Sequence, residues 1–550
     1  MPTLEWIGKD KVINHHQQVP FRVLERHYSY DRNGRHDEDN GSENMVINGD
    51  NLEALKALLP SYDGKVKCIY IDPPYNTGNE GWVYNDNVNS PKMRKWLGEV
   101  VGKEGDDLSR HDKWLCMMYP RLKLLYKLLS DSGAIFISLD DNEIIYLRAI
   151  MDEIFGNAGF VAQVTLLCNP KGRSQDKYFA NCHEYLLVYT KSVLPIGSFS
   201  VAKDDSKIQK DYKLSDSNGA YRLLELRNTH REFGKANRPN LWYPIFVSPN
   251  GAVSLEQTAE YNEAVFPYWP DGFEGCWTWG KDLFQKDIHL LVGQQKKGVW
   301  KIYRKSYAVS ADGETAKQKP FSIWNNPLFY TEKGQVAFGQ IFPGANKNDF
   351  PQPKSVEYIA EIIRTITSGD DIVLDSFAGS GTTAHAVLKL NKQDGGNRKF
   401  ILVEMMDYAD LVTAERAKRV ISGYADVAGA GGDFSYYDLG EMLLLPDGNL
   451  NEGLDDLKIR EYVYYMETKE PLPLYGNIDN KYYLGRSNDT AYYFYYEKND
   501  VTTLDHSFLI TIGEKADGYI IYADICTLSE SELKHYNVTF KKIPRDIVKL

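Results

Sequence analysis

The sequence predicts an α/β protein in which one doubly wound, parallel sheet is interrupted by a long insertion. Hydrophobic runs with the length of buried strands alternate with amphipathic helical segments over residues 45–195, and the same alternation returns over 341–428. Residues 196–340 lack this alternation and are rich in aromatic residues, Pro and Gly. Alternating strands and helices are typical of a parallel sheet with helices on both faces. The insertion is expected to form a separate, irregular module.

The 550 residues are too many for a single compact core, so several domains are expected. The N-terminal segment ends in a polar stretch with the composition of a linker or loop. The C-terminal part is acidic and rich in Tyr, and we expect an α+β region there. The predicted division is 1–44, 45–195, 196–340, 341–428 and 429–550.

In the first half of the interrupted domain, turn-forming sequences separate each strand from the next helix. Residues 76–112 are rich in Gly, Asn and Asp, and we expect them to form a loop. The predicted order is a helix at 51–59, a strand at 66–71, this loop, a helix at 113–129, a strand at 134–139, a helix ending near 155, and strands at 160–167 and 183–191.

The second half follows the same alternation. The predicted order is a helix at 355–367, a strand at 371–377, a Gly-rich turn, a helix from about residue 382 and a strand at 399–404. Within the insertion, we expect the Trp residues to form a core, because an irregular module needs large side chains to close its interior. The Tyr-rich segment 492–497 is expected to be a strand packed on one face.

The composition argues against several classes of protein. No apolar run reaches the roughly 18 residues that a membrane-spanning helix needs, and the first residues lack the apolar core of a signal peptide. We therefore expect a cytoplasmic protein without membrane contact. The six cysteines have no spacing typical of a disulfide framework or a zinc site, so no metal site is predicted. A net charge of −12 argues against a protein that coats nucleic acid nonspecifically.

A glycine-rich turn joins a predicted buried strand to a helix, with the sequence Asp375-Ser376-Phe377-Ala378-Gly379-Ser380-Gly381. Glycines let the chain turn tightly and let a ligand approach the backbone, and the free N–H groups of a helix start favour an anion. No Gly-Lys-Ser/Thr follows, which excludes a P-loop. The next strand ends at Glu404, where a doubly wound fold places a carboxylate for ribose hydroxyls. This combination predicts a nucleoside-bearing cofactor, either a dinucleotide or S-adenosylmethionine.

A second turn, Asp72-Pro73-Pro74-Tyr75, directly follows the strand at 66–71. An aromatic amino group is a poor nucleophile because its lone pair is delocalised, and acceptors that hold its N–H groups favour transfer to it. Asp72 offers a carboxylate, and the Pro-Pro step fixes the backbone so that the Pro73 carbonyl points into the site. Tyr75 offers a flat face on which an extruded base can stack. The structural alternative is a stiff turn after a strand.

Together, the segments YIDPPYNTG and LDSFAGSGTTAHAV resemble the amino-DNA methyltransferases. The catalytic motif precedes the cofactor motif, with an insertion between them, and this order resembles the β class, whose insertion is a target-recognition domain. NGDNLEAL and FPQPKSVEYIAEIIR resemble two further elements of the cofactor site. A more specific resemblance, to the modification subunits of type III restriction-modification systems, is carried by RPNLWYPI, the Trp277-Thr278-Trp279 segment and IIYADICTLSESELKHYNVTFKKIPRDI.

The resemblance implies a Rossmann-like methyltransferase sheet that binds S-adenosylmethionine. It implies that Asp72 and the Pro73 carbonyl hold the target amino group, while Pro74 keeps the turn in shape and Tyr75 stacks on the flipped base. Asp rather than Ser at position 72 favours N6 of adenine over N4 of cytosine. The implied cofactor-binding residues are Asp50, Lys354, Asp375, Phe377, Ala378, Gly379, Ser380, Gly381 and Glu404.

The implied partner is duplex DNA, and a homodimer and a restriction subunit are further expectations. Residues 165–345 hold 23 Lys and Arg against 18 Asp and Glu, whereas residues 430–550 hold 12 against 21, so we expect DNA at the middle of the chain. Two basic clusters there are predicted to contact phosphates, and the alternative for each residue is a solvated surface. They consist of Arg222, Arg227, Arg231, Lys235 and Arg238, and of Lys296, Lys297, Lys301, Arg304 and Lys305.

Three alternatives stay open at this point. The methylated group could be N4 of cytosine instead of N6 of adenine. The chain could also be a DNA-recognition subunit that positions a nuclease partner, although the two complete motifs argue against this. Finally, it could methylate RNA or a protein amide, against which Asp72 and the large insertion argue.

Overall fold

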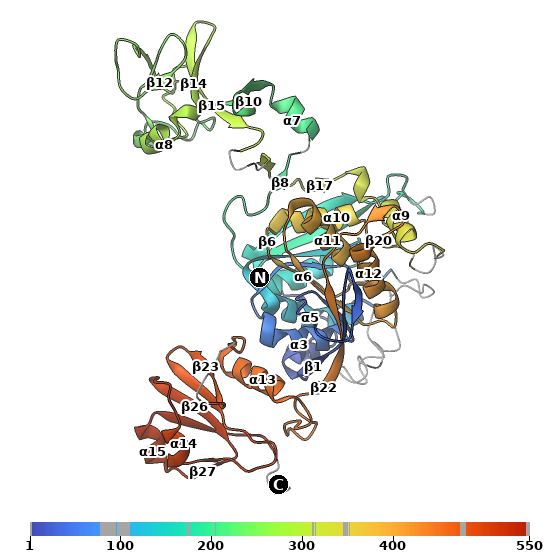
Figure 1. The fold of residues 1–550 in the computed structure, drawn as a ribbon. Helices are drawn as coiled ribbons and strands as arrows, with labels where there is room; N and C mark the ends of the chain where they lie inside the picture. Colours follow the sequence, from blue (N-terminus) through green and yellow to red (C-terminus); the bar gives the residue numbers. More distant parts are fainter. Residues whose placement is uncertain are drawn as a thin grey trace. The chain divides into compact units, whose positions relative to one another are not determined.

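The computed structural model describes residues 3–77, 95, 110–172, 176–203, 205–310, 313, 315–344, 350, 352–473 and 480–545. The chain divides into two compact units, which are Met1–Phe199 with Pro320–Leu550 and the inserted Ser200–Lys319 (Figure 1). The loop predicted at 76–112 lies largely outside the described residues. The inserted unit is shorter than the segment 196–340 that the sequence sets apart.

The larger unit is built on one mixed sheet, in which parallel strands form the centre. Among the described residues this sheet has 11 strands, in the order β17 (Ile323–Trp324), β6 (Phe160–Leu167), β7 (His183–Thr190), β5 (Leu129–Leu139), β4 (Val66–Ile71), β18 (Ile372–Asp375), β19 (Lys399–Glu404), β3 (Met45–Asn48), β22 (Phe434–Met442), β1 (Arg22–Asp31) and β2 (Gly34–His36). The strands β1, β2 and β22 thus extend the same sheet, although they come from the predicted segments 1–44 and 429–550.

The expectation that β7 continues a parallel sheet is wrong. β7 runs antiparallel to β5, with Tyr185 opposite Leu139, and antiparallel to β6. A parallel return needs a long crossover, usually a helix, and no helix lies between β6 and β7 in the part of the chain that is described. The start of β7 therefore lies at the same edge as the ends of β4 and β5.

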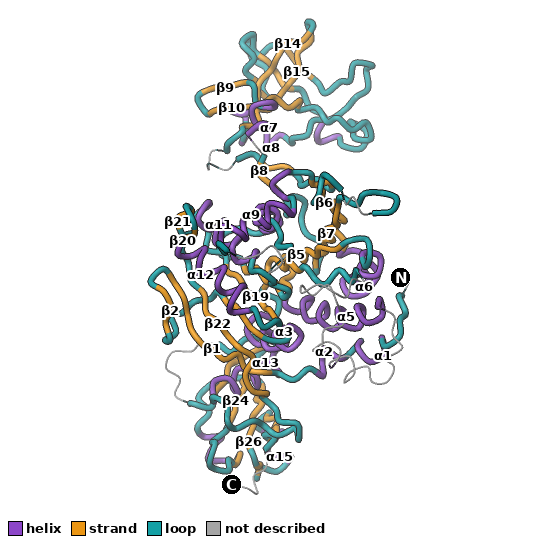
Figure 2. The backbone as a smooth tube through the Cα atoms, turned by 90° about the vertical axis from the view of Figure 1, so that its right-hand side faces the viewer, coloured by secondary structure: helices purple, strands orange, loops and turns teal. Residues whose placement is uncertain are grey.

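Helices cover both faces of the sheet (Figure 2). One face carries α3 (Asn51–Tyr62), α5 (Arg110–Leu128) and α6 (Ile144–Phe155), and the other carries α10 (Val356–Ile366), α11 (Thr382–Asp394) and α12 (Glu415–Ser422). Side chains of a strand alternate between faces. Accordingly, Ile69 and Ile71 of β4 belong to the first core, and Cys68 and Tyr70 belong to the second. The doubly wound α/β class predicted from the sequence is confirmed.

The helix α10 shows why these segments form where they do. The Ser355 hydroxyl caps its start by accepting a hydrogen bond from the Tyr358 backbone N–H. Its buried side chains Ile359, Ile362 and Ile366 recur at the spacing of one helix face. Burying each such side chain contributes about 1.5–3 kcal/mol to folding.

Short elements complete the region around the large sheet. They are α1 (Lys9–Val12), α2 (His15–Gln18), the 3-10 helices η2 (Asn157–Gly159) and η5 (Pro327–Phe329), α9 (Thr331–Ile341), the π-helix η6 (Ala409–Ala414), β20 (Gly423–Tyr424) and β21 (Val427–Ala428). No described helix is both long enough and apolar enough to cross a membrane.

The C-terminal part of the larger unit contains a second, smaller sheet. Its strands lie in the order β23 (Tyr483–Ser487), β24 (Thr490–Phe494), β26 (Gly518–Ala523) and β28 (Val538–Lys542), and the last three are parallel. The other elements are α13 (Asp456–Thr468), β25 (Thr503–Leu504), α14 (His506–Ile510), β27 (Ile525–Cys526) and α15 (Glu530–His535). The expected Tyr-rich strand is therefore β24, which overlaps the predicted segment 492–497 but begins earlier, at Thr490, and ends earlier, at Phe494.

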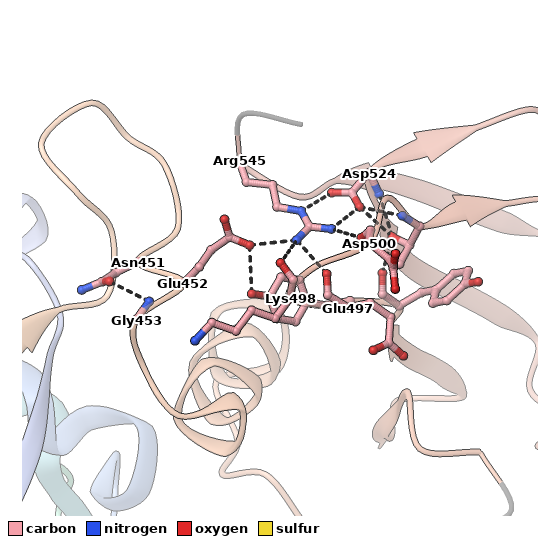
Figure 3. A network of polar contacts seen from close by, with 11 residues as sticks. Asn451, Glu452, Gly453, Glu497, Lys498, Asp500, Asp524 and Arg545 are labelled. Atoms are coloured by element: carbon pink, nitrogen blue, oxygen red, sulfur yellow. Dashed lines mark hydrogen bonds and ion pairs between the residues drawn. The ribbon is translucent and has the colours of Figure 1, made fainter. Parts of the chain in front are cut away.

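A buried ion pair holds this smaller sheet together (Figure 3). The Arg545 guanidinium, whose side chain is 1% exposed, donates hydrogen bonds to both carboxylate oxygens of Asp524, at 2.6 and 2.5 Å. It also contacts the Glu452 carboxylate at 2.8 Å and the Asp500 carbonyl at 2.7 Å. These contacts join the segment after β28 to three other parts of the C-terminal region. Arg545 therefore fixes the end of the described chain to this region.

The inserted unit has its own core. Trp277 and Trp279 are buried there with Tyr243, which confirms the expectation of a Trp core for these two residues. The elements are β8 (Val201–Ala202), α7 (Asp205–Asp211), β9 (Leu214–Asp216), β10 (Gly219–Glu225), η3 (Pro239–Leu241), β11 (Ile245–Val247), β12 (Val253–Ser254), β13 (Glu263–Val265), α8 (Lys281–Lys286), η4 (Ile288–Leu290), β14 (Leu291–Lys296), β15 (Val299–Tyr307) and β16 (Lys317–Gln318).

Candidate active site

The two turns that the sequence singles out follow neighbouring strands of the large sheet. Asp72 comes directly after β4, and Asp375 is the last residue of β18. The two strands are parallel partners, with Leu374 opposite Ile69. Carboxyl ends of parallel strands meet at one edge, so both turns start side by side although they are far apart in the chain.

Hydrogen bonds fix the turn after β4 to the helices beside it. The Trp114 indole N–H donates to the Pro74 carbonyl oxygen over 2.7 Å. Asn76 has a left-handed φ of +56°, and its amide N–H₂ donates to the Glu143 carboxylate and to the Arg110 carbonyl. Asn tolerates this conformation better than most residues. The second half of the turn is therefore fixed, by a bond to the Pro74 carbonyl and by the bonds of the Asn76 side chain.

A polar cluster surrounds the Asp72 carboxylate. The Lys354 ammonium lies 3.4 Å from Asp72 Oδ1 and donates hydrogen bonds of 2.7 Å to Glu184 Oε2 and to the Tyr75 hydroxyl oxygen. The Tyr75 hydroxyl in turn donates to Glu184 Oε2 over 3.1 Å. The side chains of Asp72, Lys354 and Glu184 are 27%, 16% and 9% exposed. The turn after β4, the start of β7 and the segment before α10 thus meet at this cluster.

Burial and neighbouring charges shift the pKa values of Asp72 and Lys354 in opposite directions. Burial raises the pKa of Asp72 to about 6, the Lys354 ammonium lowers it, and the Glu184 carboxylate raises it. Burial lowers the pKa of Lys354, but the carboxylates of Asp72 and Glu184 outweigh this and raise it above its usual value. Burial also raises the pKa of Tyr75 far above its usual value. At neutral pH the cluster therefore holds an ionised Asp72, a charged Lys354 and a neutral Tyr75.

The glycine turn is shaped by two carboxylates. Asp375 accepts hydrogen bonds from the Phe377 backbone N–H at 3.0 Å and from the Thr383 hydroxyl at 2.5 Å. Glu404 accepts one from the Gly379 N–H at 2.8 Å. Gly379 and Gly381 have left-handed φ values of +53° and +75°. These bonds hold the backbone of the turn against the ends of β18 and β19.

Behind the glycine turn, η6 and α12 provide a rigid support. The Thr413 hydroxyl donates to the Gly379 carbonyl over 2.6 Å. The fully buried Arg416 donates to the hydroxyls of Ser380 and Thr382, at 2.9 and 2.8 Å. A Cβ on Gly381 would lie 2.8 Å from the Thr413 carbonyl oxygen, so only glycine fits there. Single π-helical turns are frequent at functional sites.

A third set of contacts joins the start of α3 to the glycine turn. Asp50 caps α3 by accepting from the Leu52 N–H at 2.8 Å. The buried Arg121 lies 3.3 Å from the Asp50 carboxylate and donates to the Asn51 amide oxygen over 2.5 Å. Asn51 donates to the Ser376 carbonyl over 3.0 Å. Asp50 is therefore connected to the glycine turn through two side chains.

The structure brings the predicted residues together in two groups. Asp72, Tyr75 and Lys354 contact one another at the turn after β4. Asp375, Gly379, Ser380, Gly381 and Glu404 form the turn after β18, together with the half-buried Phe377 and with Ala378, which donates its N–H to the Val403 carbonyl. Three further residues of the site were not predicted from the sequence, namely Glu184, Trp114 and Arg416. Only Glu184 had a usable signal, as an acidic residue at the start of an apolar strand.

The predicted DNA-binding cations all lie in the inserted unit. Six of them contact carboxylates of the same unit, in the pairs Arg222–Asp211, Arg227–Glu225, Arg231–Asp271, Lys235–Glu274, Lys301–Glu225 and Lys305–Asp216. Within the described residues, no carboxylate pairs with Arg238, Lys296, Lys297 or Arg304. Lys296 instead lies 4.8 Å from the centre of the Tyr303 ring. These four cations are the ones whose charge no neighbouring acid neutralises.

Comparison with known proteins gives the family. A family model described as DNA methylase matches residues 66–414. The EcoPI Mod subunit, a type III restriction-modification enzyme of Escherichia phage P1, is 35% identical over 421 residues, which are 73% of this chain and 63% of that protein. The chain thus spans less than two thirds of that relative. The type II methyltransferase M.KpnI of Klebsiella pneumoniae is 35% identical over 66% of this chain and 81% of that protein.

Among solved structures, the PvuII DNA methyltransferase, described as cytosine-N4-specific, is similar over 68% of this chain and 86% of its own, with 12% identity and a TM-score of 0.34. The family model covers both the turn after β4 and the glycine turn, and the similarity to Mod subunits extends over most of the chain. This chain belongs to the DNA methylase family.

Proposed function

We propose that the chain is an S-adenosylmethionine-dependent methyltransferase that modifies N6 of adenine in duplex DNA, as the modification subunit of a type III-like restriction-modification system. The single observation that carries this proposal is the Asp72 carboxylate 3.4 Å from the Lys354 ammonium, in the turn after a strand that pairs with the strand before the glycine turn. The similarity to Mod subunits supports the assignment to a restriction-modification system.

The glycine turn fits the proposed cofactor. The Ser376 hydroxyl is buried and has no hydrogen-bond partner among the described residues, which leaves a polar atom for a ligand. Asp375 and Glu404 are carboxylates at the ends of neighbouring strands, and such oxygens suit the amino group and ribose hydroxyls of a nucleoside. With Asp50, Phe377 and Gly379, they would hold S-adenosylmethionine, which supplies an activated methyl group when bound.

In the proposed reaction, the residues of the turn after β4 prepare the amino nitrogen. The Asp72 carboxylate and the Pro73 carbonyl each accept a hydrogen bond from one N–H of the amino group. The nitrogen lone pair is then less delocalised into the ring, and the nitrogen becomes nucleophilic. Tyr75 stacks on the base, which must leave the duplex to reach the turn. Asp72 then takes up the proton that the methylated nitrogen loses, or passes it to water.

An acid at position 72 supports adenine over cytosine as the target. We expect nucleosides from treated DNA to contain N6-methyladenine when purified protein, S-adenosylmethionine and duplex DNA are combined and the digest is analysed by mass spectrometry. Asp72→Ala should bind DNA with unchanged affinity and transfer no methyl group. N4-methylcytosine in the digest, or methyl transfer to competing RNA instead of DNA, would overturn the proposal.

The inserted unit is the proposed target-recognition domain. Four of its cations pair with no carboxylate of the described residues and are therefore suited to phosphate contacts, namely Arg238, Lys296, Lys297 and Arg304. A homodimer and a restriction subunit are the proposed partners. Light scattering of the purified chain tests the dimer, and co-purification with a co-expressed nuclease-translocase subunit tests the second partner.

A further inference from the structure

Glu184 is an acidic residue in an unusual place. It is the second residue of β7, where it lies opposite Leu166 of β6. Its side chain is only 9% exposed, and an ionised carboxylate is costly to bury without partners. Because β7 runs antiparallel, this residue lies at the edge where β4 ends. Its position there points to a role at the site and not in the core.

The contacts of Glu184 connect three parts of the site. Its Oε2 accepts hydrogen bonds from Lys354 at 2.7 Å and from the Tyr75 hydroxyl at 3.1 Å. Lys354 is 3.4 Å from Asp72 Oδ1, which is too long for a good charge-assisted hydrogen bond. Lys354 therefore bonds to Glu184 and Tyr75, and it acts on Asp72 mainly through its charge.

This arrangement resolves a conflict in the proposed reaction. Asp72 needs a nearby cation to stay ionised in a buried site, but a cation bonded directly to its oxygens would compete with the amino group. Lys354 meets the first need through its charge, and Glu184 meets the second, because it accepts the hydrogen bond that the ammonium would otherwise donate to the Asp72 oxygens. It also holds the Tyr75 hydroxyl, which restricts the ring on which a base is proposed to stack.

We propose that Glu184 is a positioning residue for methyl transfer, which bonds Lys354 and Tyr75 so that the oxygens of the Asp72 carboxylate stay available to the target amino group. This inference rests on the proposed function. Glu184 itself touches neither the base nor the methyl group.

The charges that face Asp72 predict how its titration responds. Lys354 and a hydrogen bond with Tyr75 favour the ionised form, and Glu184 disfavours it. Tyr70 and Tyr358 are neutral, and burial raises the pKa of Asp375 to about 7, so Asp375 is mostly protonated where Asp72 titrates. Removing the Glu184 charge should therefore lower the pKa of Asp72 from about 6, and removing the Lys354 charge should raise it. A charge at this distance shifts a neighbouring pKa by roughly half a unit or more.

The test compares pH profiles of kcat/KM for the wild type, Glu184→Gln and Lys354→Gln. Since ionised Asp72 is the active form, activity falls as pH decreases through its pKa. Glu184→Gln should move this acid limb to lower pH by roughly half a unit to one unit, and Lys354→Gln should move it to higher pH. We also expect Glu184→Gln to reduce kcat several-fold, because an amide holds the ammonium less firmly.

Glu153→Gln is the matched control. Glu153 also contacts a lysine and a tyrosine, Lys9 at 3.0 Å and Tyr119 at 2.8 Å, but it lies on α6 away from the turn. Its removal should lower stability without moving the acid limb. An unmoved limb in Glu184→Gln, or a shift in the same direction as Lys354→Gln, would overturn the proposal.

A second measurement does not depend on activity. With ¹³C-carboxyl-labelled aspartate, the Asp72 resonance is identified by its absence in Asp72→Asn, and its titration is followed by NMR. Glu184→Gln should titrate at lower pH than the wild type, and Lys354→Gln at higher pH. If the wild type transfers no methyl group to DNA, the proposed function fails, while this titration still decides the role of Glu184.

Discussion

The Trp114 indole N–H donates a hydrogen bond of 2.7 Å to the carbonyl oxygen of Pro74, inside the turn that carries Asp72. Trp114 is fully buried in α5. Pro74 is followed by Tyr75, whose hydroxyl is held by Glu184. The turn is therefore fixed at two points, by the bond that the Pro74 carbonyl accepts from Trp114 and by the bond that the Tyr75 hydroxyl donates to Glu184.

Trp114→Phe should reduce kcat by about tenfold or more, because the ring still fills the core while the Pro74 carbonyl loses its donor. Unfolding free energy should fall by about 1–3 kcal/mol, the cost of a buried acceptor left without a partner. Steady-state kinetics and urea unfolding check both expectations.

Trp277→Phe is the matched control for this prediction. Trp277 makes the same kind of bond, from its indole N–H to the Tyr243 carbonyl over 2.8 Å, but in the inserted unit. The control should lose stability and keep the wild-type kcat on saturating DNA. Full activity in Trp114→Phe would show that the bond to Pro74 is not needed for the turn.

Asp375→Asn should be more stable than the wild type at alkaline pH. Burial raises the pKa of Asp375 to about 7, so the folded protein holds this proton more tightly than the unfolded chain does. The associated stability is present at low pH and is lost as pH rises from about 4 towards 7. In Asn, the amide oxygen can accept from the Phe377 N–H and the amide N–H₂ can donate to the Thr383 hydroxyl oxygen, and the side chain carries no charge.

In urea unfolding, we expect the advantage of Asp375→Asn over the wild type to grow between pH 5 and pH 8, to on the order of 1–3 kcal/mol. Measuring both proteins at each pH cancels the contributions of all other groups. A variant that is less stable than the wild type at pH 8 would contradict the sign of this prediction.

Arg416→Lys should weaken binding of S-adenosylmethionine by about tenfold, or about 1.4 kcal/mol. Both hydroxyls, of Ser380 and Thr382, accept from the guanidinium Nη1, and the shorter lysine side chain ends before that position, so the glycine turn loses its support from behind. Isothermal titration calorimetry measures the affinity directly.

Arg398→Lys provides the comparison for Arg416. Arg398 is also buried and bonds to Asp394 at the opposite end of α11. We expect this variant to be less stable but to bind the cofactor normally. Equal losses of affinity in the two variants would mean that general stability, and not the glycine turn, is responsible.

Lys296→Gln combined with Lys297→Gln should weaken DNA binding and lower its dependence on salt. Each phosphate contact contributes about 0.9 to the slope of log K against log salt concentration, so the double variant should lose about 1–2 from this slope. Fluorescence anisotropy with a labelled duplex over a salt series measures it. Lys305→Gln should change the slope less, because Lys305 is bonded to Asp216 at 2.6 Å.

The sequence was most informative where the local pattern alone determines structure. The strands β4 and β19 have the predicted bounds, because short, mainly apolar segments between turn-forming residues leave little choice. The sequence also predicts that β4 and β18 lie close together, because the two halves of the interrupted α/β pattern must form one sheet.

The parts that were missed depend on tertiary structure. The direction of β7 follows from a connection without a helix, and only this reversal places Glu184 beside Lys354. Trp114 and Arg416 appear in the sequence as ordinary members of amphipathic helices. Their bonds to the two turns depend on how α5 and α12 are rotated against the sheet, and hydrophobic periodicity does not encode which buried polar atom meets which partner.

The chain enters and leaves the inserted unit through one short ladder, in which Val201 of β8 lies opposite Gln318 of β16. The chain therefore enters and leaves the inserted unit at neighbouring positions. A different domain whose two ends also lie side by side could be joined at the same place. Such an exchange cuts none of the strands that carry Asp72, Glu184 or the glycine turn. Replacement of the inserted unit at this ladder would therefore leave the residues of the candidate active site in their places.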